Sequence, residues 1–117
     1  LSSVSLEYFE LAVDAQGRIV GVAGFDRAAS EALLRSLAVT ADWRGRGLGE
    51  QLVARREAAA RAAGVSRFFL LTTSAADYFR RLGYCDVARA EVPPAIAAHA
   101  QFRSLCPASA TCLGKRL

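Results

Sequence analysis

The residues best suited to chemistry form a glycine- and arginine-rich segment in the middle of the chain, Arg44-Gly45-Arg46-Gly47-Leu48-Gly49. An apolar run ending at Val39 precedes it, and a long alanine- and arginine-rich segment ending at Gly64 follows it. Glycine allows a backbone to turn sharply and to approach a ligand closely. The first N–H groups of a helix have no intrahelical acceptor and lie at its positive end. This strand, loop and helix layout therefore predicts a site for a phosphate or diphosphate group, with arginine side chains adding charge and forked donors.

Two common phosphate motifs do not fit this segment. A Walker-type loop has Lys and then Ser or Thr after its last glycine, whereas Glu50 and Gln51 stand there. The dinucleotide fingerprint Gly-x-Gly-x-x-Gly, counted from Gly45, has Glu50 where its third glycine belongs. The pattern that remains is Arg44-x-x-Gly47-x-Gly49 after a strand ending in Leu37-Ala38-Val39. The alternative interpretation is a surface glycine turn with solvated arginines.

Composition restricts the class of protein. A chain of 117 residues is expected to form one domain, and 53% hydrophobic with 22% charged residues is typical of globular proteins. No apolar run approaches the roughly 20 residues of a membrane span, so we predict no membrane partner. A net charge of +4 suits an acidic ligand. The arginines are spread along the chain rather than clustered with aromatic residues, which argues against nucleic acid.

The cysteines, Cys85, Cys106 and Cys112, are odd in number and lack the spacing of metal ligands. This argues against a disulfide framework or a zinc site, so we predict no metal and a reducing, cytoplasmic environment. A nucleophilic pair of Cys106 with His99 is a further hypothesis, and the lack of a third, orienting group argues against it. The chain has no Met, so we expect it to be a trimmed version of something longer.

Hydrophobic periodicity and turn residues predict strands at 8–13, 19–25, 31–39, 65–72, 84–92 and 109–117, after a frayed start at 1–5. Helices are predicted at 48–63, from an N-cap at Ser74 to residue 82, and over a short segment at 93–100. The first three strands are expected to form an antiparallel meander. Strand 31–39, the long helix and strand 65–72 are expected to form a right-handed β-α-β crossover. On the long helix, Arg55, Arg56 and Arg61 are expected to lie mostly outward, and Trp43 is expected to pack beside the loop.

In this order of elements, the glycine loop and the segment Tyr78-Phe79-Arg80-Arg81-Leu82-Gly83-Tyr84 resemble the GNAT superfamily of N-acetyltransferases. The resemblance implies an α/β (α+β) fold with a mixed, mostly antiparallel sheet, a central splayed parallel pair and helices on both faces. Family members usually begin with one more strand and one or two helices. We therefore expect residues 1–117 to be a single, N-terminally short domain that lacks them. The segment 70–84 resembles synthases of N-acetylglutamate, and the tail at 92–109 resembles GNAT proteins encoded with bacterial arsenic-resistance genes.

The resemblance also implies how acetyl-CoA is held. Backbone groups of Leu37, Ala38 and Val39 would pair with the pantetheine arm, and an N–H among them would act as oxyanion donor to the thioester. The segment Arg44 to Gly49 would cradle the pyrophosphate. The general-acid Tyr of many family members falls at Phe79, which leaves the catalytic residues unknown and Phe79 as a cofactor contact. Tyr78 is one residue away and points about 100° aside on a helix.

For the acceptor, Arg35 and Arg103 are predicted to hold a carboxylate through a forked contact, and Ser36 to add a hydrogen bond. The alternatives are an outward strand residue for Arg35 and a solvated loop for Arg103. The predicted activity is transfer of the acetyl group of acetyl-CoA to the amine of a small amino-acid-like molecule. The competing interpretations are an acetyl-CoA-binding module without turnover and a basic nucleic-acid-binding domain. A homodimer is a further prediction, and arsenic binding by the cysteines is a weaker hypothesis.

Overall fold

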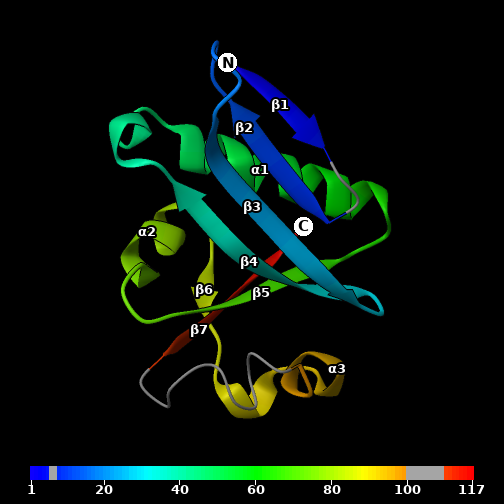
Figure 1. Ribbon diagram of the computed structural model, residues 1–117. Helices are drawn as coiled ribbons and strands as arrows, with labels where there is room; N and C mark the ends of the chain where they lie inside the picture. Colours follow the sequence, from blue (N-terminus) through cyan, green and yellow to red (C-terminus); the bar gives the residue numbers. More distant parts are fainter. Residues whose placement is uncertain (6–7, 100–109) are drawn as a thin grey trace. The chain divides into compact units, whose positions relative to one another are not determined.

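A computed structural model describes residues 1–5, 8–99 and 110–117 of the chain. Its strands form one mixed sheet in the order β1-β2-β3-β4-β5-β7-β6 (Figure 1). The strands are β1 Ser2–Ser5, β2 Phe9–Val13, β3 Ile19–Ala28, β4 Glu31–Val39, β5 Arg67–Thr72, β6 Cys85–Asp86 and β7 Thr111–Arg116. The α-helices are α1 Leu48–Ala62, α2 Ala76–Arg81 and α3 Pro94–Ala97, and the 3-10 helices are η1 Ala41–Trp43 and η2 Arg89–Glu91.

The chain folds as two compact units. Unit 1 comprises Leu1–Asp26 and Leu34–Gly64, and unit 2 comprises Arg27–Leu33 and Val65–Leu117. The loop between β4 and α1 therefore lies wholly in unit 1, together with the second half of β4.

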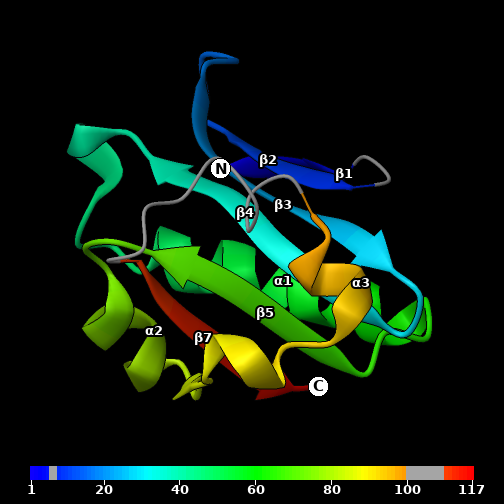
Figure 2. The same cartoon turned by 90° about the horizontal axis from the view of Figure 1, so that it is seen from below.

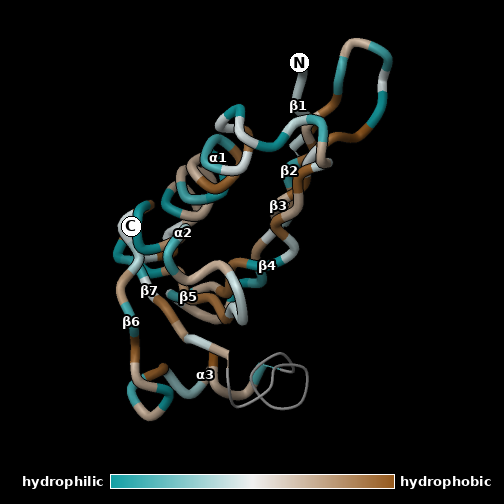
Figure 3. Tube along the Cα trace, turned by 90° about the vertical axis from the view of Figure 1, so that its left-hand side faces the viewer, coloured by the Kyte–Doolittle hydropathy of each residue, from teal (hydrophilic) through white to brown (hydrophobic). Residues whose placement is uncertain are grey.

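In unit 1, β2 pairs antiparallel with β3, as the predicted meander requires. On its other side, β2 pairs antiparallel with β1. The turn between β2 and β3 uses Gly17 at a φ of 81°, a left-handed conformation that glycine adopts without strain. Helix α1 faces these strands (Figure 3). Gly21 allows this close packing, because a Cβ there would lie 2.9 Å from a methyl carbon of Leu52. One buried hydrophobic cluster of the unit consists of Ala12, Val20, Ala23, Leu48 and Leu52.

In unit 2, β5 lies between the start of β4 and β7 (Figure 2). Its pairing with β4 is parallel and runs from Glu31–Arg67 to Leu33–Phe69, which confirms the parallel strands of the predicted crossover. Its pairing with β7 is antiparallel, and β6 pairs with the other side of β7. One buried hydrophobic cluster of the unit consists of Leu33, Phe69, Val92, Ile96 and Cys112. The splay predicted for the parallel pair stays a prediction.

Two expected elements differ in extent. The frayed start is wrong, because Ser2–Ser5 forms the edge strand β1, paired with Glu10 to Val13 of β2. A strand that we expected to be missing is thus present, although no α-helix precedes α1 among the described residues. The strand predicted at 84–92 is reduced to Cys85–Asp86. Beyond it the backbone bonds locally, from Glu91 N–H to the Ala88 carbonyl, and so leaves the sheet.

Two predicted helix residues also behave differently. Ser74 is not the N-cap of α2; Ala75 is, and the Thr72 hydroxyl oxygen accepts hydrogen bonds from the N–H groups of both residues. Arg56 does not lie outward on α1. Its side chain is only 3% exposed, and its Nη2 donates to Oε1 of buried Glu10 at 2.7 Å. A buried carboxylate on β2 opposite the helix thus draws this arginine into the core.

Candidate functional site

The loop between β4 and α1 is held at its start by local hydrogen bonds. Thr40 N–H donates to the Val20 carbonyl of β3 at 2.9 Å, and Trp43 N–H donates to the Thr40 carbonyl at 3.0 Å. The next residues include Gly45 at a φ of 78° and Gly47 at a φ of 79°. Gly45 and Gly47 thus adopt the left-handed conformation that glycine takes without strain, and Gly47 is one of the two glycines expected to allow a sharp turn here. The other, Gly49, lies inside α1.

The amides of this loop find no hydrogen-bond acceptor in the described part of the chain. Among the described residues, no carbonyl or side chain accepts a hydrogen bond from the N–H groups between Gly45 and Glu50. The first bond of α1 runs from Gln51 N–H to the carbonyl of Gly47, its N-cap residue, at 3.1 Å, and no side chain caps the helix. Unpaired N–H groups at the positive end of a helix are the donors that an anion requires.

The two arginines of the loop are positioned by the loop itself. Arg44 Nε donates to the Val39 carbonyl at 3.1 Å. The Arg46 guanidinium lies 4.8 Å from the ring centre of Trp43, which packs against the core of unit 1. Within the described part of the chain, neither arginine forms an ion pair. Their charges are thus uncompensated and close to the unsatisfied amides.

The strand before the loop contains a strained residue. Ser36 has a φ of 61°, which is unusual for a residue other than glycine and costs about 1–3 kcal/mol. Burial along β4 changes at this point: Ala32 to Leu34 are buried in succession, whereas Ser36 and Ala38 are exposed. The backbone is therefore turned just before Leu37, Ala38 and Val39. Nothing in the sequence indicates this strain, because serine carries no signal for a positive φ.

Arg35, which is predicted to bind the acceptor substrate, contacts other side chains of unit 1. Its Nε lies 2.8 Å from Oδ2 of Asp26, at ion-pair distance but outside hydrogen-bond geometry. Its guanidinium lies 4.8 Å from the ring centre of Phe9, and its Nη1 is 3.4 Å from the Ser36 hydroxyl oxygen. The structure thus brings Arg35 and Ser36 together. Asp26 is a neighbour that the sequence analysis did not identify, because this contact depends on the register of β3 against β4.

The other predicted contacts are on unit 2. Phe79 of α2 is 7% exposed and makes edge-to-face contacts with Tyr78 and Tyr84, at ring-centre distances of 5.2 and 5.6 Å. This aromatic cluster explains why Phe79 is buried, and its role as a cofactor contact stays a prediction. Arg103 and Cys106 lie outside the described residues. Among the residues that are described, no group of three or more His, Cys, Asp or Glu side chains is placed to hold a metal ion.

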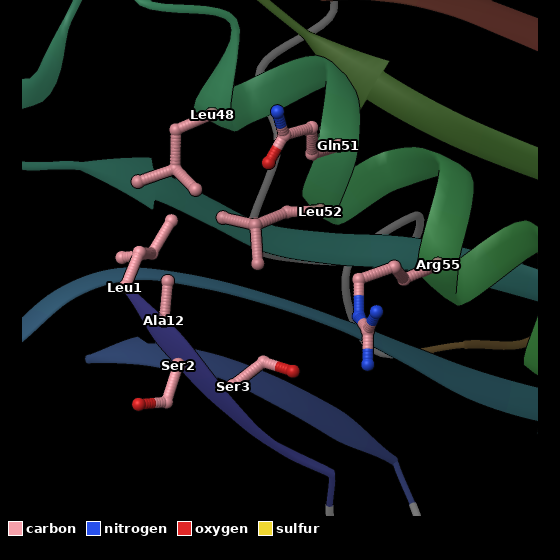
Figure 4. Close-up of a pocket in the computed structure, with 8 residues that line it drawn as sticks. All are labelled: Leu1, Ser2, Ser3, Ala12, Leu48, Gln51, Leu52 and Arg55. Atoms are coloured by element: carbon pink, nitrogen blue, oxygen red, sulfur yellow. The ribbon is translucent and has the colours of Figure 1, made fainter. Parts of the chain in front are cut away.

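A separate cavity of about 160 Å³ lies in unit 1 between α1 and the β1–β2 edge (Figure 4). Leu48 and Leu52 of α1 face Leu1 and Ala12 across it, and polar groups of Ser2, Ser3, Gln51 and Arg55 complete its lining. The cavity is too small for a cofactor with a nucleotide and a pantetheine arm. No described helix combines the length and apolarity that crossing a bilayer requires.

Comparison with known proteins decides the family. Residues 7–86 match the acetyltransferase (GNAT) domain family. The chain belongs to this family. An amino-acid acetyltransferase of Pseudomonas putida is 37% identical over 92 residues, which cover 77% of this chain and 21% of the relative. Another, of Ectopseudomonas mendocina, is 49% identical over 51 residues, or 44% of this chain and 12% of the relative.

Solved structures agree with this membership. The N-acetylglutamate synthase of Neisseria gonorrhoeae, solved with coenzyme A and N-acetyl-glutamate, superimposes with a TM-score of 0.84 at 27% identity. The match covers 94% of this GNAT chain and 26% of the synthase. A GNAT acetyltransferase of Staphylococcus aureus shares the fold, with a TM-score of 0.76 and 19% identity over 93% of this chain and 66% of its own. The GNAT fold and acetyltransferase family predicted from the glycine loop are thus confirmed, although the chain spans only part of its curated relatives.

Proposed function

We propose that this GNAT domain transfers the acetyl group of acetyl-CoA to the amine of a small amino-acid-like acceptor. The observation that carries the proposal is the run of N–H groups from Gly45 to Glu50, at the positive end of α1, for which no described residue provides a hydrogen-bond acceptor. In a GNAT domain, these amides are suited to the diphosphate of coenzyme A. The names of the relatives, amino-acid acetyltransferases, support an amino-acid-like acceptor.

In the proposed reaction, the neutral amine of the acceptor attacks the thioester carbonyl carbon. The C–S bond of the tetrahedral intermediate then breaks, and the sulfur leaves as a thiolate. The main chain of Leu37, Ala38 and Val39 pairs with the pantetheine arm, and one of its N–H groups stabilises the oxyanion. The strained turn at Ser36 supports this role, because such strain is found where a backbone is held for function.

Three proton transfers are needed besides the bond changes. The acceptor ammonium loses one proton to water or to a base before the attack, and the attacking nitrogen loses a second to water or to a base as the intermediate collapses to the neutral amide. The departing thiolate, from a thiol with an ordinary pKa of about 8.5, takes a proton from water. Phe79 has no proton to give, so the proposal assigns no side chain as general acid.

For the acceptor carboxylate we propose Arg35, with Ser36 adding a hydrogen bond and Arg103 as a further contact. The Asp26 carboxylate and the Phe9 ring hold the Arg35 guanidinium in place. A fixed guanidinium loses little side-chain entropy on binding a carboxylate. The negative charge of Asp26 offsets part of this gain, so we expect moderate affinity for the acceptor.

The test is a thiol-release assay with acetyl-CoA and a panel of amino acids, with coenzyme A binding measured by calorimetry. Release with at least one amino acid supports the proposal, and failure to bind coenzyme A overturns it. In the same assay, Arg35→Lys should raise KM for the acceptor at least several-fold, because lysine cannot form the forked contact, and leave KM for acetyl-CoA unchanged. An unchanged KM for the acceptor would show that Arg35 does not bind it.

A second candidate is a GNAT module that binds acetyl-CoA without turning it over. Phe79, at the position of the usual general-acid Tyr, favours this candidate. Binding of coenzyme A without release on any acceptor would support it. The cytoplasmic location, the homodimer and the arsenic-resistance context stay predictions.

A further inference from the structure

Glu50 is the acidic residue in the first turn of α1, three residues after the N-cap Gly47. Its side-chain Oε2 lies 3.3 Å from the position that a Cβ would take on Gly47. The carboxylate thus reaches back over the loop whose N–H groups are unsatisfied. It forms no hydrogen bond or ion pair with any described residue, and it is exposed to solvent. No hydrogen bond or ion pair within the described ranges therefore explains its orientation.

The electrostatics of the loop provide an explanation. A negative charge is favourable beside the N-terminus of a helix, where the helix dipole and the unsatisfied amides create positive potential. The positive charges of Arg44 and Arg46 in the same loop add to this potential, although their guanidinium groups contact the Val39 carbonyl and the Trp43 ring rather than Glu50. Glu50 thus supplies a weakly held anion at the place where the proposed function puts a diphosphate.

We infer that Glu50 sets the affinity of this loop for coenzyme A by competing with the diphosphate for the same positive potential. When the diphosphate binds, the carboxylate either swings away from Gly47 and loses its favourable position, or stays and repels the ligand. Both cases weaken binding relative to the same loop without Glu50. The same repulsion speeds the release of coenzyme A after transfer. This inference rests on the proposed function, because it concerns the same loop.

The size of the effect follows from Coulomb's law. At the water-like dielectric of a solvated loop, repulsion between one carboxylate and two nearby diphosphate charges corresponds to roughly three- to tenfold weaker binding. Salt screens charges that are this exposed, so the difference should shrink as ionic strength rises. A purely structural role for Glu50 would instead make its removal weaken binding.

The experiment compares Glu50→Gln, Glu50→Asp and Glu91→Gln with the wild-type protein in calorimetric titrations with coenzyme A. Glu50→Gln removes the charge at nearly constant shape and should lower Kd three- to tenfold at low salt, with a smaller gain in about 0.5 M salt. Glu50→Asp keeps the charge but is too short to reach Gly47, so its gain should be smaller. Glu91→Gln, on the exposed η2, changes the net charge equally and should leave Kd unchanged.

The apo proteins provide a second readout. Glu50→Gln should lower the melting temperature without ligand, because the helix end loses a favourable charge, and coenzyme A should raise that temperature more than it does for wild type. Unchanged or weaker coenzyme A binding by Glu50→Gln, or an equal gain in affinity in Glu91→Gln, overturns the role of Glu50. The proposed function still stands in that case if the wild-type protein binds coenzyme A. Absence of binding by all four proteins overturns both.

Discussion

Replacing Gly47 with alanine tests the diphosphate loop directly. Gly47 has a φ of 79°, and an added Cβ would lie 3.3 Å from the Glu50 carboxylate beside the unsatisfied amides. The chain offers a matched control in Gly17, which has a φ of 81° and no atom within 4 Å of an added Cβ. Gly17 lies in the turn between β2 and β3 of the same unit. The two substitutions therefore impose the same backbone strain, but only one is in the proposed site.

The expected magnitudes separate stability from binding. An L-residue in the left-handed conformation costs roughly 1–2 kcal/mol, so both variants should lose about this much free energy of unfolding. The Glu50 end is exposed and can move aside, so it adds little. At Gly47 the methyl group also displaces the diphosphate from the amides. Each charge-assisted hydrogen bond lost is worth about 1.5–3 kcal/mol, or roughly 10- to 150-fold in Kd.

The assay pairs urea denaturation with calorimetric titration of coenzyme A at a temperature where all three proteins are folded. We expect similar midpoints for Gly17→Ala and Gly47→Ala, and a lost or strongly weakened affinity for Gly47→Ala alone. Wild-type affinity in Gly47→Ala would refute the placing of the diphosphate on this loop. An equal loss of affinity in Gly17→Ala would show that strain, and not position, is responsible.

Two further predictions concern strain and acid stability. Ser36→Gly should raise the free energy of unfolding by up to about 1 kcal/mol, because it relieves a φ of 61°. The control Ala29→Gly relieves a φ of 57° in the β3–β4 turn and should raise the free energy of unfolding similarly. Only Ser36→Gly should lower kcat/KM for the acceptor. Equal losses of kcat/KM in both variants would contradict the role of the Ser36 hydroxyl. Burial raises the pKa of Glu10, but hydrogen bonds from Ser5, Arg56 and Ser3 and the charge of Arg55 more than offset this, so its pKa lies below the model-compound value of 4.5. The ionised carboxylate thus stabilises the fold above about pH 4.5, and this contribution is lost as pH falls through the lower folded-state pKa. Glu10→Gln should lower the free energy of unfolding by about 3–5 kcal/mol at neutral pH, because it leaves Arg56 buried without its counter-charge. Denaturation at several pH values should also show that the free energy of unfolding falls less steeply toward acid pH than in wild type. An unchanged pH dependence would contradict this role of Glu10.

Much of the candidate loop could be predicted from the sequence, because the features involved are local. Helix α1 begins at Leu48 as predicted, and Gly47 provides the sharp turn before it, since turn geometry and helix starts depend on adjacent residues. The bounds of β4 also match the prediction. The prediction of a strand at 84–92 was wrong beyond Asp86, because the backbone there forms local turn hydrogen bonds instead of sheet hydrogen bonds.

The charges illustrate what only the tertiary structure decided. Arg56 is buried against Glu10, which is 46 residues away in the chain. Arg35 on β4 forms an ion pair with Asp26 on the neighbouring strand β3. Neither pairing leaves a trace in helical or strand periodicity, because the burial of a charged side chain depends on which opposite charge the packing brings near. The strain at Ser36 likewise depends on the strand as a whole. The sequence by itself therefore determined the family and the loop, whose conformations are set by neighbouring residues, whereas long-range packing decided which charges and backbone groups remain available to a ligand.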